Sequence, residues 1–204
     1  DVLSHAHKPL ICVGGGTILG NGEQVVREFA NKFHIPVVST MMGIGVMPND
    51  DDLYMGMLGT NGKPHANYAV HECDVLVLVG ARVADRAVVK PYKLERRNTT
   101  IVHIDVDPAE IGKNLGTTVP LVGDVHVIFE NLLQYEIPGD YTAWNEELAE
   151  KKAAYVDRRH FNPDFVNPCR FVQTLSSKMN DDAIYVADVG QNQLWSADNY
   201  VMKH

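Results

Sequence analysis

The chain has 204 residues, of which 45% are apolar and 22% charged, an ordinary balance for a globular protein in water. Its formal net charge of -8 argues against a nucleic-acid-binding surface, because no cluster of lysines and arginines offsets it. No apolar run approaches the roughly 20 residues that a membrane span needs, and the first residues do not resemble a signal peptide. We therefore expect a cytoplasmic protein whose three cysteines, none in C-x-x-C spacing, are reduced and buried.

Strand-like and helix-like patterns alternate through the first 133 residues. Five short apolar runs each end in a turn that bears Gly, Asp, Arg or Thr. The runs and their turns are Leu10–Val13 with Gly14–Gly16, Val37–Val38 with Ser39–Thr40, Val75–Val79 with Gly80–Arg82, Ile101–Ile104 with Asp105–Asp107, and Leu121–Val122 with Gly123–Asp124. Helices are predicted around Val25–Phe33, over His65–Glu72, from Asp107 and over Val125–Leu133. This alternation predicts an α/β fold, a doubly wound, Rossmann-like parallel sheet of about six strands.

The pattern changes after residue 133. Residues 134–167 are predicted to be a linker with one helix, Tyr141–Arg159. A second α/β unit begins at residue 168, with an amphipathic helix over Arg170–Met179, a buried strand over Ala183–Ala187 and a turn at Asp188–Gln191. In that helix, Phe171 and Val172 are among the residues expected to point inward. Residues 168–204 are too few for a core of their own, so we expect a truncated unit and a chain that is a fragment.

The five turns suggest a ligand site. In open α/β sheets ligands bind at the carboxyl edge, where all five turns would lie. A G-x-G-x-x-G fingerprint fails because Leu19 occupies the third glycine position, and Ser39–Thr40 stands where an NAD site needs a carboxylate. The glycine N–H groups and Arg82 suit a pyrophosphate, whereas Asp105 suits ribose hydroxyls.

Each of these residues also has a purely structural interpretation. Asp107 and Asp124 fit helix caps, and Arg82 beside Asp85 and Arg86 fits a surface ion-pair cluster. His103, inside a strand, fits a core histidine with satisfied hydrogen bonds better than a catalyst.

Seven segments together resemble acetolactate synthase, a thiamine-diphosphate-dependent enzyme. They are Lys8–Gly16, Met41–Gly45, Gly56–Gly59, Gly80–Arg86, His103–Ile111, Gly123–Asp124 and Asp188–Trp195. The resemblance covers nearly the whole chain. It implies a central FAD-binding domain over residues 1–133 and the start of a thiamine-diphosphate domain over residues 168–204.

The resemblance also implies site residues. Those expected to line FAD are Gly14, Gly15, Gly16, Thr40, Met41, Leu58, Gly59, Arg82, Asp105, Val106, Gly123, Asp124, Gln193 and Leu194. Those expected to meet thiamine diphosphate are Val189, Gly190, Gln191 and Asn192. Arg86 would face the second keto acid, and no residue of the chain is expected to bind a metal ion.

The chain departs from the family pattern at three places. Thr60–Lys63 replaces the usual Met-His-Gly-Thr, and Arg82–Arg86 reads Arg-Val-Ala-Asp-Arg where Arg-Phe-Asp-Asp-Arg is usual. Asn192 replaces a histidine in the Gly-Gln-His segment. An asparagine amide can still donate to a diphosphate oxygen but cannot carry a proton.

The activity implied for the parent protein is the condensation of two pyruvates, or of pyruvate and 2-ketobutyrate, with loss of CO2. The parent would use FAD, thiamine diphosphate and Mg2+, and would form a homo-oligomer that a regulatory subunit can accompany. The fragment alone is expected to be inactive, because the resemblance places the activating glutamate and the magnesium motif outside it. Three alternatives stay open: a related carboligase or decarboxylase such as glyoxylate carboligase, a non-catalytic nucleotide- or flavin-binding module, and the same fold with an empty site.

Overall fold

The first two-thirds of the chain form a six-stranded sheet in which every strand pair is parallel. The computed structural model describes residues 1–83, 99–116, 118–157, 159, 161–180 and 182–202. The strands are β1 (Pro9–Val13), β2 (Val37–Ser39), β3 (Tyr54–Met57), β4 (Val75–Val79), β5 (Thr100–Asp105) and β6 (Val119–Val122). Their order, β3-β2-β1-β4-β5-β6, is that of a Rossmann-type sheet, so the predicted fold class is confirmed.

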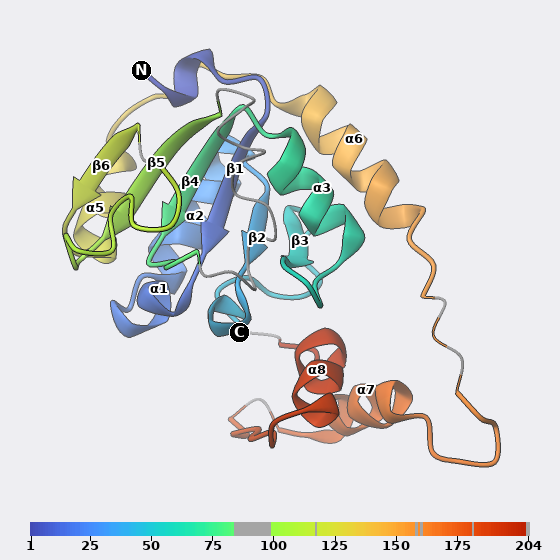
Figure 1. Ribbon diagram of the computed structural model, residues 1–204. Coiled ribbons are helices and arrows are strands. Elements are labelled where there is room, and N and C mark those ends of the chain that lie inside the picture. The colour runs from blue at the N-terminus through green and yellow to red at the C-terminus, as the bar shows by residue number, and fades with distance from the viewer. Residues whose placement is uncertain (84–98, 117, 158, 160, 181, 203–204) are drawn as a thin grey trace.

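Helices cover both faces of the sheet (Figure 1). Three of the helices are short: η1 (Leu3–His5) precedes β1, α1 (Gly15–Leu19) follows β1, and η2 (Met41–Gly43) follows β2. The longer helices are α2 (Glu23–Phe33), α3 (Pro64–Glu72), α5 (Val125–Leu132), α6 (Thr142–Ala153), α7 (Pro168–Lys178) and α8 (Gln191–Asn199). None of them, within the described ranges, is long and apolar enough to cross a membrane.

The central strands are apolar throughout because both of their faces are buried. Side chains alternate across a strand, so Ile11 and Val13 of β1 face one way and Leu10 and Cys12 the other. The first face packs on α2 and α5, where Phe29 and Phe129 meet edge to face at 5.1 Å between ring centroids. The second packs on α3 and α6. The three cysteines are buried as predicted, and burial raises the pKa of Cys12 to about 12.

Helix α6 crosses the second face as a strap (Figure 1). Trp144 is 2% exposed, and its indole Nε1 donates to the carbonyl of Pro9 at 3.0 Å. Lys8 forms an ion pair with Glu147 at 2.7 Å and lies over the Trp144 ring. The predicted helix over residues 141–159 is therefore present, but it ends at Ala153.

Helices α7 and α8 pack on each other beyond the carboxyl ends of the strands (Figure 1). Helix α7 begins at a proline, and the Asn167 side chain caps it by accepting from the Arg170 N–H at 3.1 Å. Tyr185 stacks on Tyr200 at 4.4 Å between centroids and shares a 2.8 Å hydrogen bond with Ser196 of α8.

Three sequence-based predictions are wrong. Asp107 begins a series of turns instead of a helix, because its carboxylate accepts from the nearby Ala109 N–H at 2.8 Å and Gly112 takes a φ of +71°. Residues 183–187 form no strand and are not buried: Ile184 is 88% exposed, since no described segment pairs with it. Phe171 of α7 points to solvent, whereas Val172 is buried as expected.

Candidate functional site

The centre of the predicted edge is a contact between two backbone turns. The strand order reverses between β1 and β4, and a crevice forms at such a switch point. There the Gly14 N–H donates to Val79 and the Gly16 N–H to Gly80, both at 2.9 Å. A Cβ on Gly16 would lie 2.7 Å from the Gly80 Cα, and Gly80 itself has a φ of +54°. These glycines are required because the two turns touch, a reason that the sequence alone did not reveal.

The end of β2 adds an apolar wall next to this contact. The Thr40 N–H donates to the Val13 carbonyl at 2.9 Å, and Gly43 packs directly on the same carbonyl. The η2 turn that follows places Met42 at the surface with 72% of its area exposed. Met42 thus offers a flexible apolar side chain beside a backbone surface.

The opposite side of the edge carries two carboxylates. Asp105 ends β5, is buried, and accepts from the Asp107 N–H at 2.9 Å. Val106 follows with 72% of its area exposed. Asp124 follows β6 and caps α5 by accepting from the Val127 N–H at 3.1 Å, which confirms the cap interpretation. Asp124 has a second carboxylate oxygen, so capping and ligand binding are compatible.

Asn67, which the sequence analysis does not identify, holds the turn that follows β3. Gly59 has a φ of +107°, and Asn67 of α3 binds both of its peptide groups. The Gly59 N–H donates to the Asn67 side-chain oxygen at 2.8 Å, and the Asn67 amide donates to the Gly59 carbonyl at 2.9 Å. This clamp fixes the turn that carries Leu58 and Gly59. An asparagine within a helix gives no local sequence signal of such a role.

A further edge candidate is Arg82, which follows β4 and is exposed. Its carbonyl accepts from the Asn114 side chain at 2.8 Å. Asp85 and Arg86 of the suggested ion-pair cluster lie outside the described residues, so their predicted roles stay predictions.

The candidates on the sheet thus form one row. Since neighbouring strands lie about 4.8 Å apart, the row from Gly59 at β3 to Asp124 at β6 is roughly 24 Å long. It presents glycine backbone at its centre, exposed apolar Met42 and Val106, two carboxylates and the Arg82 cation. Such a row can bind an extended ligand with an apolar part, hydroxyls and a diphosphate.

Neither buried histidine near the sheet carries positive charge at neutral pH. Burial lowers the pKa of His103, whose Nδ1 accepts from the Gly112 N–H at 3.4 Å. Its Nε2 has no hydrogen-bond partner within the described residues, so the prediction of a fully satisfied core histidine is wrong in that respect. Burial and the nearby lysines Lys152 and Lys63 lower the pKa of His65 to about 4.

The C-terminal candidates lie on α8 and the turn before it. Gly190 has a φ of +82° and open space around it, and Val189 is exposed. Gln191 and Leu194 line a cleft of about 760 Å³ with Asn61 and Gly62, which follow the β3 turn. The structure therefore brings α8 next to the β3 end of the row.

Residues 1–132 match the family model described as "Thiamine pyrophosphate enzyme, central domain". The chain is 36% identical to a probable acetolactate synthase large subunit of Methanocaldococcus jannaschii, over 99% of this chain and 36% of that protein. It is 34% identical to the acetolactate synthase large subunit of Lactococcus lactis, over 99% and 35%. It is 36% identical to acetolactate synthase 1 of Nicotiana tabacum, over 98% and 30%.

The chain spans roughly a third of the length of these relatives. The matched family model covers β1–β6, α5 and the row of candidate residues that they carry. Through this central domain, the chain belongs to the thiamine pyrophosphate enzyme family.

Proposed function

We propose that the chain is the central part of an acetolactate synthase catalytic subunit. The observation that carries this proposal is the extent of the similarity, which continues beyond the central domain through α8. A module that only binds a nucleotide has no reason to share the Asp188–Trp195 segment with acetolactate synthases. The parent protein would condense two pyruvates, or pyruvate and 2-ketobutyrate, with loss of CO2, as a homo-oligomer that a regulatory subunit can accompany.

The proposed ligand of the sheet edge is FAD. The Gly14 and Gly16 N–H groups already bond to Val79 and Gly80, so these glycines fit the ligand by allowing close approach of the backbone and not as donors. Arg82 suits the diphosphate, Asp105 suits ribose hydroxyls, and exposed Met42 and Val106 suit ring systems. The family resemblance implies that the flavin is held for architecture and not for net redox chemistry. Gln193 and Leu194 would approach it from α8, while Val189–Asn192 would meet thiamine diphosphate. In the parent, Mg2+ would accompany the thiamine diphosphate.

Thermal denaturation of the full chain with FAD or ADP tests the edge. A ligand at 100 times its Kd stabilises a folded protein by about 2.7 kcal/mol, so both ligands should raise the Tm. Asp105→Asn should reduce the FAD shift, because the amide can still accept from the Asp107 N–H but loses the carboxylate charge. Asp140→Asn is the matched control: its carboxylate accepts from the Thr142 N–H at 3.0 Å, away from the edge. No shift with either ligand, or equal shifts in both variants, would contradict FAD binding here.

The substrate class is tested on the longer protein that contains this chain. We expect it to form acetolactate from pyruvate in the presence of thiamine diphosphate, Mg2+ and FAD. Preferred turnover of glyoxylate or benzoylformate would instead assign a related carboligase or decarboxylase, an alternative that the departures at Asn61, Ala84 and Asn192 keep open.

A further inference from the structure

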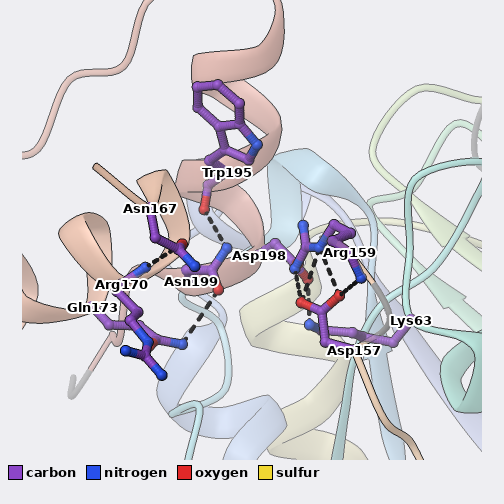
Figure 2. A network of polar contacts seen from close by, with 9 residues as sticks. All are labelled: Lys63, Asp157, Arg159, Asn167, Arg170, Gln173, Trp195, Asp198 and Asn199. Atoms are coloured by element: carbon purple, nitrogen blue, oxygen red, sulfur yellow. Dashed lines mark hydrogen bonds and ion pairs between the residues drawn. The ribbon is translucent and has the colours of Figure 1, made fainter. Parts of the chain in front are cut away.

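A network of four charged residues joins α8 to the sheet (Figure 2). Asp198, in the last turn of α8, forms ion pairs with Lys63, the residue before α3, and with Arg159 of the connecting segment. The Arg159 Nη2 lies 2.6 Å from the Asp198 Oδ2. Arg159 is itself held by Asp157, with its Nε 2.9 Å from both carboxylate oxygens. Asp198 is therefore the point where three separate segments meet.

Asp198 and Lys63 form the shielded part of the network, whereas the Arg159 and Asp157 side chains are 37% and 39% exposed. The Asp198 side chain is 12% exposed and the Lys63 side chain 25%. Exposed pairs contribute little, whereas a shielded carboxylate that loses its cation keeps an uncompensated charge. The network contains two cations and two carboxylates, so its formal charges sum to zero. The hydrogen bonds from Arg159 hold the pKa of Asp157 at about 2, so that Asp157 keeps its charge near neutral pH.

A second contact follows directly after α8. The Met202 N–H donates to the Asn49 side chain at 2.8 Å, and the Asn49 N–H donates to the Met202 carbonyl at 3.2 Å. Both attachments are therefore at the C-terminal end of the helix. The opposite end is open, with space around Gly190 and an exposed Val189. Because a helix is stiff, fixing one end of α8 also fixes the direction of its first turn.

We propose that Asp198 is a positioning residue that latches α8 to the sheet through Lys63 and Arg159, and so orients the first turn of α8 at the carboxyl edge. The importance of that turn rests on the proposed function, since Val189–Leu194 are the expected cofactor contacts. The latch itself is a property of the folded chain and can be tested without any cofactor.

Hydrogen–deuterium exchange of the full chain measures the latch directly. In Asp198→Asn, the amides of residues 191–199 should exchange about tenfold faster, the factor that corresponds to losing about 1.4 kcal/mol of charge-assisted bonding. The amides of β4 should be unchanged. Glu110→Gln is the matched control, because Glu110 pairs with Lys113 at 2.8 Å and is 13% exposed, but lies far along the chain from α8. Unchanged exchange in α8 of Asp198→Asn would overturn the proposal.

Two further variants separate latching from general destabilisation. Lys63→Met keeps most of the aliphatic stem and should also accelerate amide exchange in α8. The double variant Lys63→Met/Asp198→Asn should accelerate exchange by less than the product of the two single-variant factors, because both substitutions break the same ion pair. Asp198→Glu retains the charge and should restore most of the protection. If Asp198→Asn also accelerates amide exchange in β4, the Lys63→Met variant decides between the two interpretations. Faster exchange in α8 but not in β4 of Lys63→Met supports the latch, and unchanged exchange in α8 of Lys63→Met overturns it.

Trp195 provides an independent optical readout. The chain has two tryptophans, of which Trp144 is buried in the core while Trp195 lines the cleft beside Asp198. Acrylamide should therefore quench fluorescence more strongly in Asp198→Asn, and equal quenching would count against the latch. Since neither measurement uses FAD or a keto acid, failure of the latch and failure of the proposed function give different results.

Discussion

At the scale of single residues, the polar side chains at the strand ends form hydrogen bonds with nearby backbone groups. The Asp105 and Asp124 carboxylates each accept a backbone N–H, and the Asn67 amide satisfies both peptide groups of Gly59. These bonds hold each turn in one conformation. A ligand would therefore meet a row that is already ordered, which lowers the entropic cost of binding.

His65 is the residue whose protonation the fold opposes most clearly. It is 7% exposed and stacks edge to face on Tyr155, while Lys63, Lys152 and Asp198 are the charged groups that act on it. Its pKa is about 4 in the folded chain against 6.5 for the free side chain. Between these values the unfolded chain binds a proton at His65 that the folded chain does not. Stability should therefore fall as the pH drops from 6.5 towards 4, by up to about 1.4 kcal/mol per pH unit.

Urea unfolding of the full chain at pH 7, 6 and 5 checks this expectation. His65→Asn removes the titrating group, so its free energy of unfolding should fall less on acidification than that of the unsubstituted chain. Other titrating groups, including His103, contribute equally to both proteins and cancel in the difference. Parallel pH profiles would show that His65 is not responsible.

At the scale of elements, backbone contact between the β1 and β4 turns decides where glycine is needed. Gly16→Ala would bring a methyl group to 2.7 Å from the Gly80 Cα, and neither backbone can withdraw without breaking the Gly16–Gly80 hydrogen bond. We expect a loss of about 1–3 kcal/mol in the free energy of unfolding, although alanine is the better helix former.

Gly123→Ala is the control for this prediction. There the new methyl group would meet the end of the Ile128 side chain at 3.2 Å, which can move aside. Its cost should stay below about 0.5 kcal/mol, as for an ordinary surface substitution. Equal urea midpoints for the two variants would refute the requirement for glycine at residue 16.

The pairing and local bonding of elements also explain why some secondary-structure predictions from the sequence are wrong. The Asp107–Glu110 pattern satisfies a helix-start rule, yet a side chain that bonds two residues ahead closes a turn instead. Residues 183–187 have the composition of a buried strand, but a strand exists only where another strand pairs with it. Strand β3 is only four residues long with a glycine inside it, so the sequence carries no clear strand pattern there, and pairing with β2 makes it a strand.

At the scale of the whole molecule, contacts between distant segments hold the sheet and the C-terminal helices together. Helix α6 reaches β1 through Trp144 and the start of β3 through Lys152, which donates to the Tyr54 carbonyl at 2.8 Å. Beyond α6, Asp198 and Met202 join α8 to the carboxyl side of the sheet. The fold thus places α8 beside the row of candidate site residues.

The sequence by itself determined the parallel sheet and the edge on which the candidate residues lie. Apolar runs mark strands buried on both faces, and turns at the ends of parallel strands must share one edge. Only the tertiary structure decided that Gly16 touches Gly80, that Asn67 clamps Gly59 and that Lys63 meets Asp198. Lys63 and Asp198 are far apart along the chain, and no local pattern encodes a contact that exists only once two folded surfaces meet.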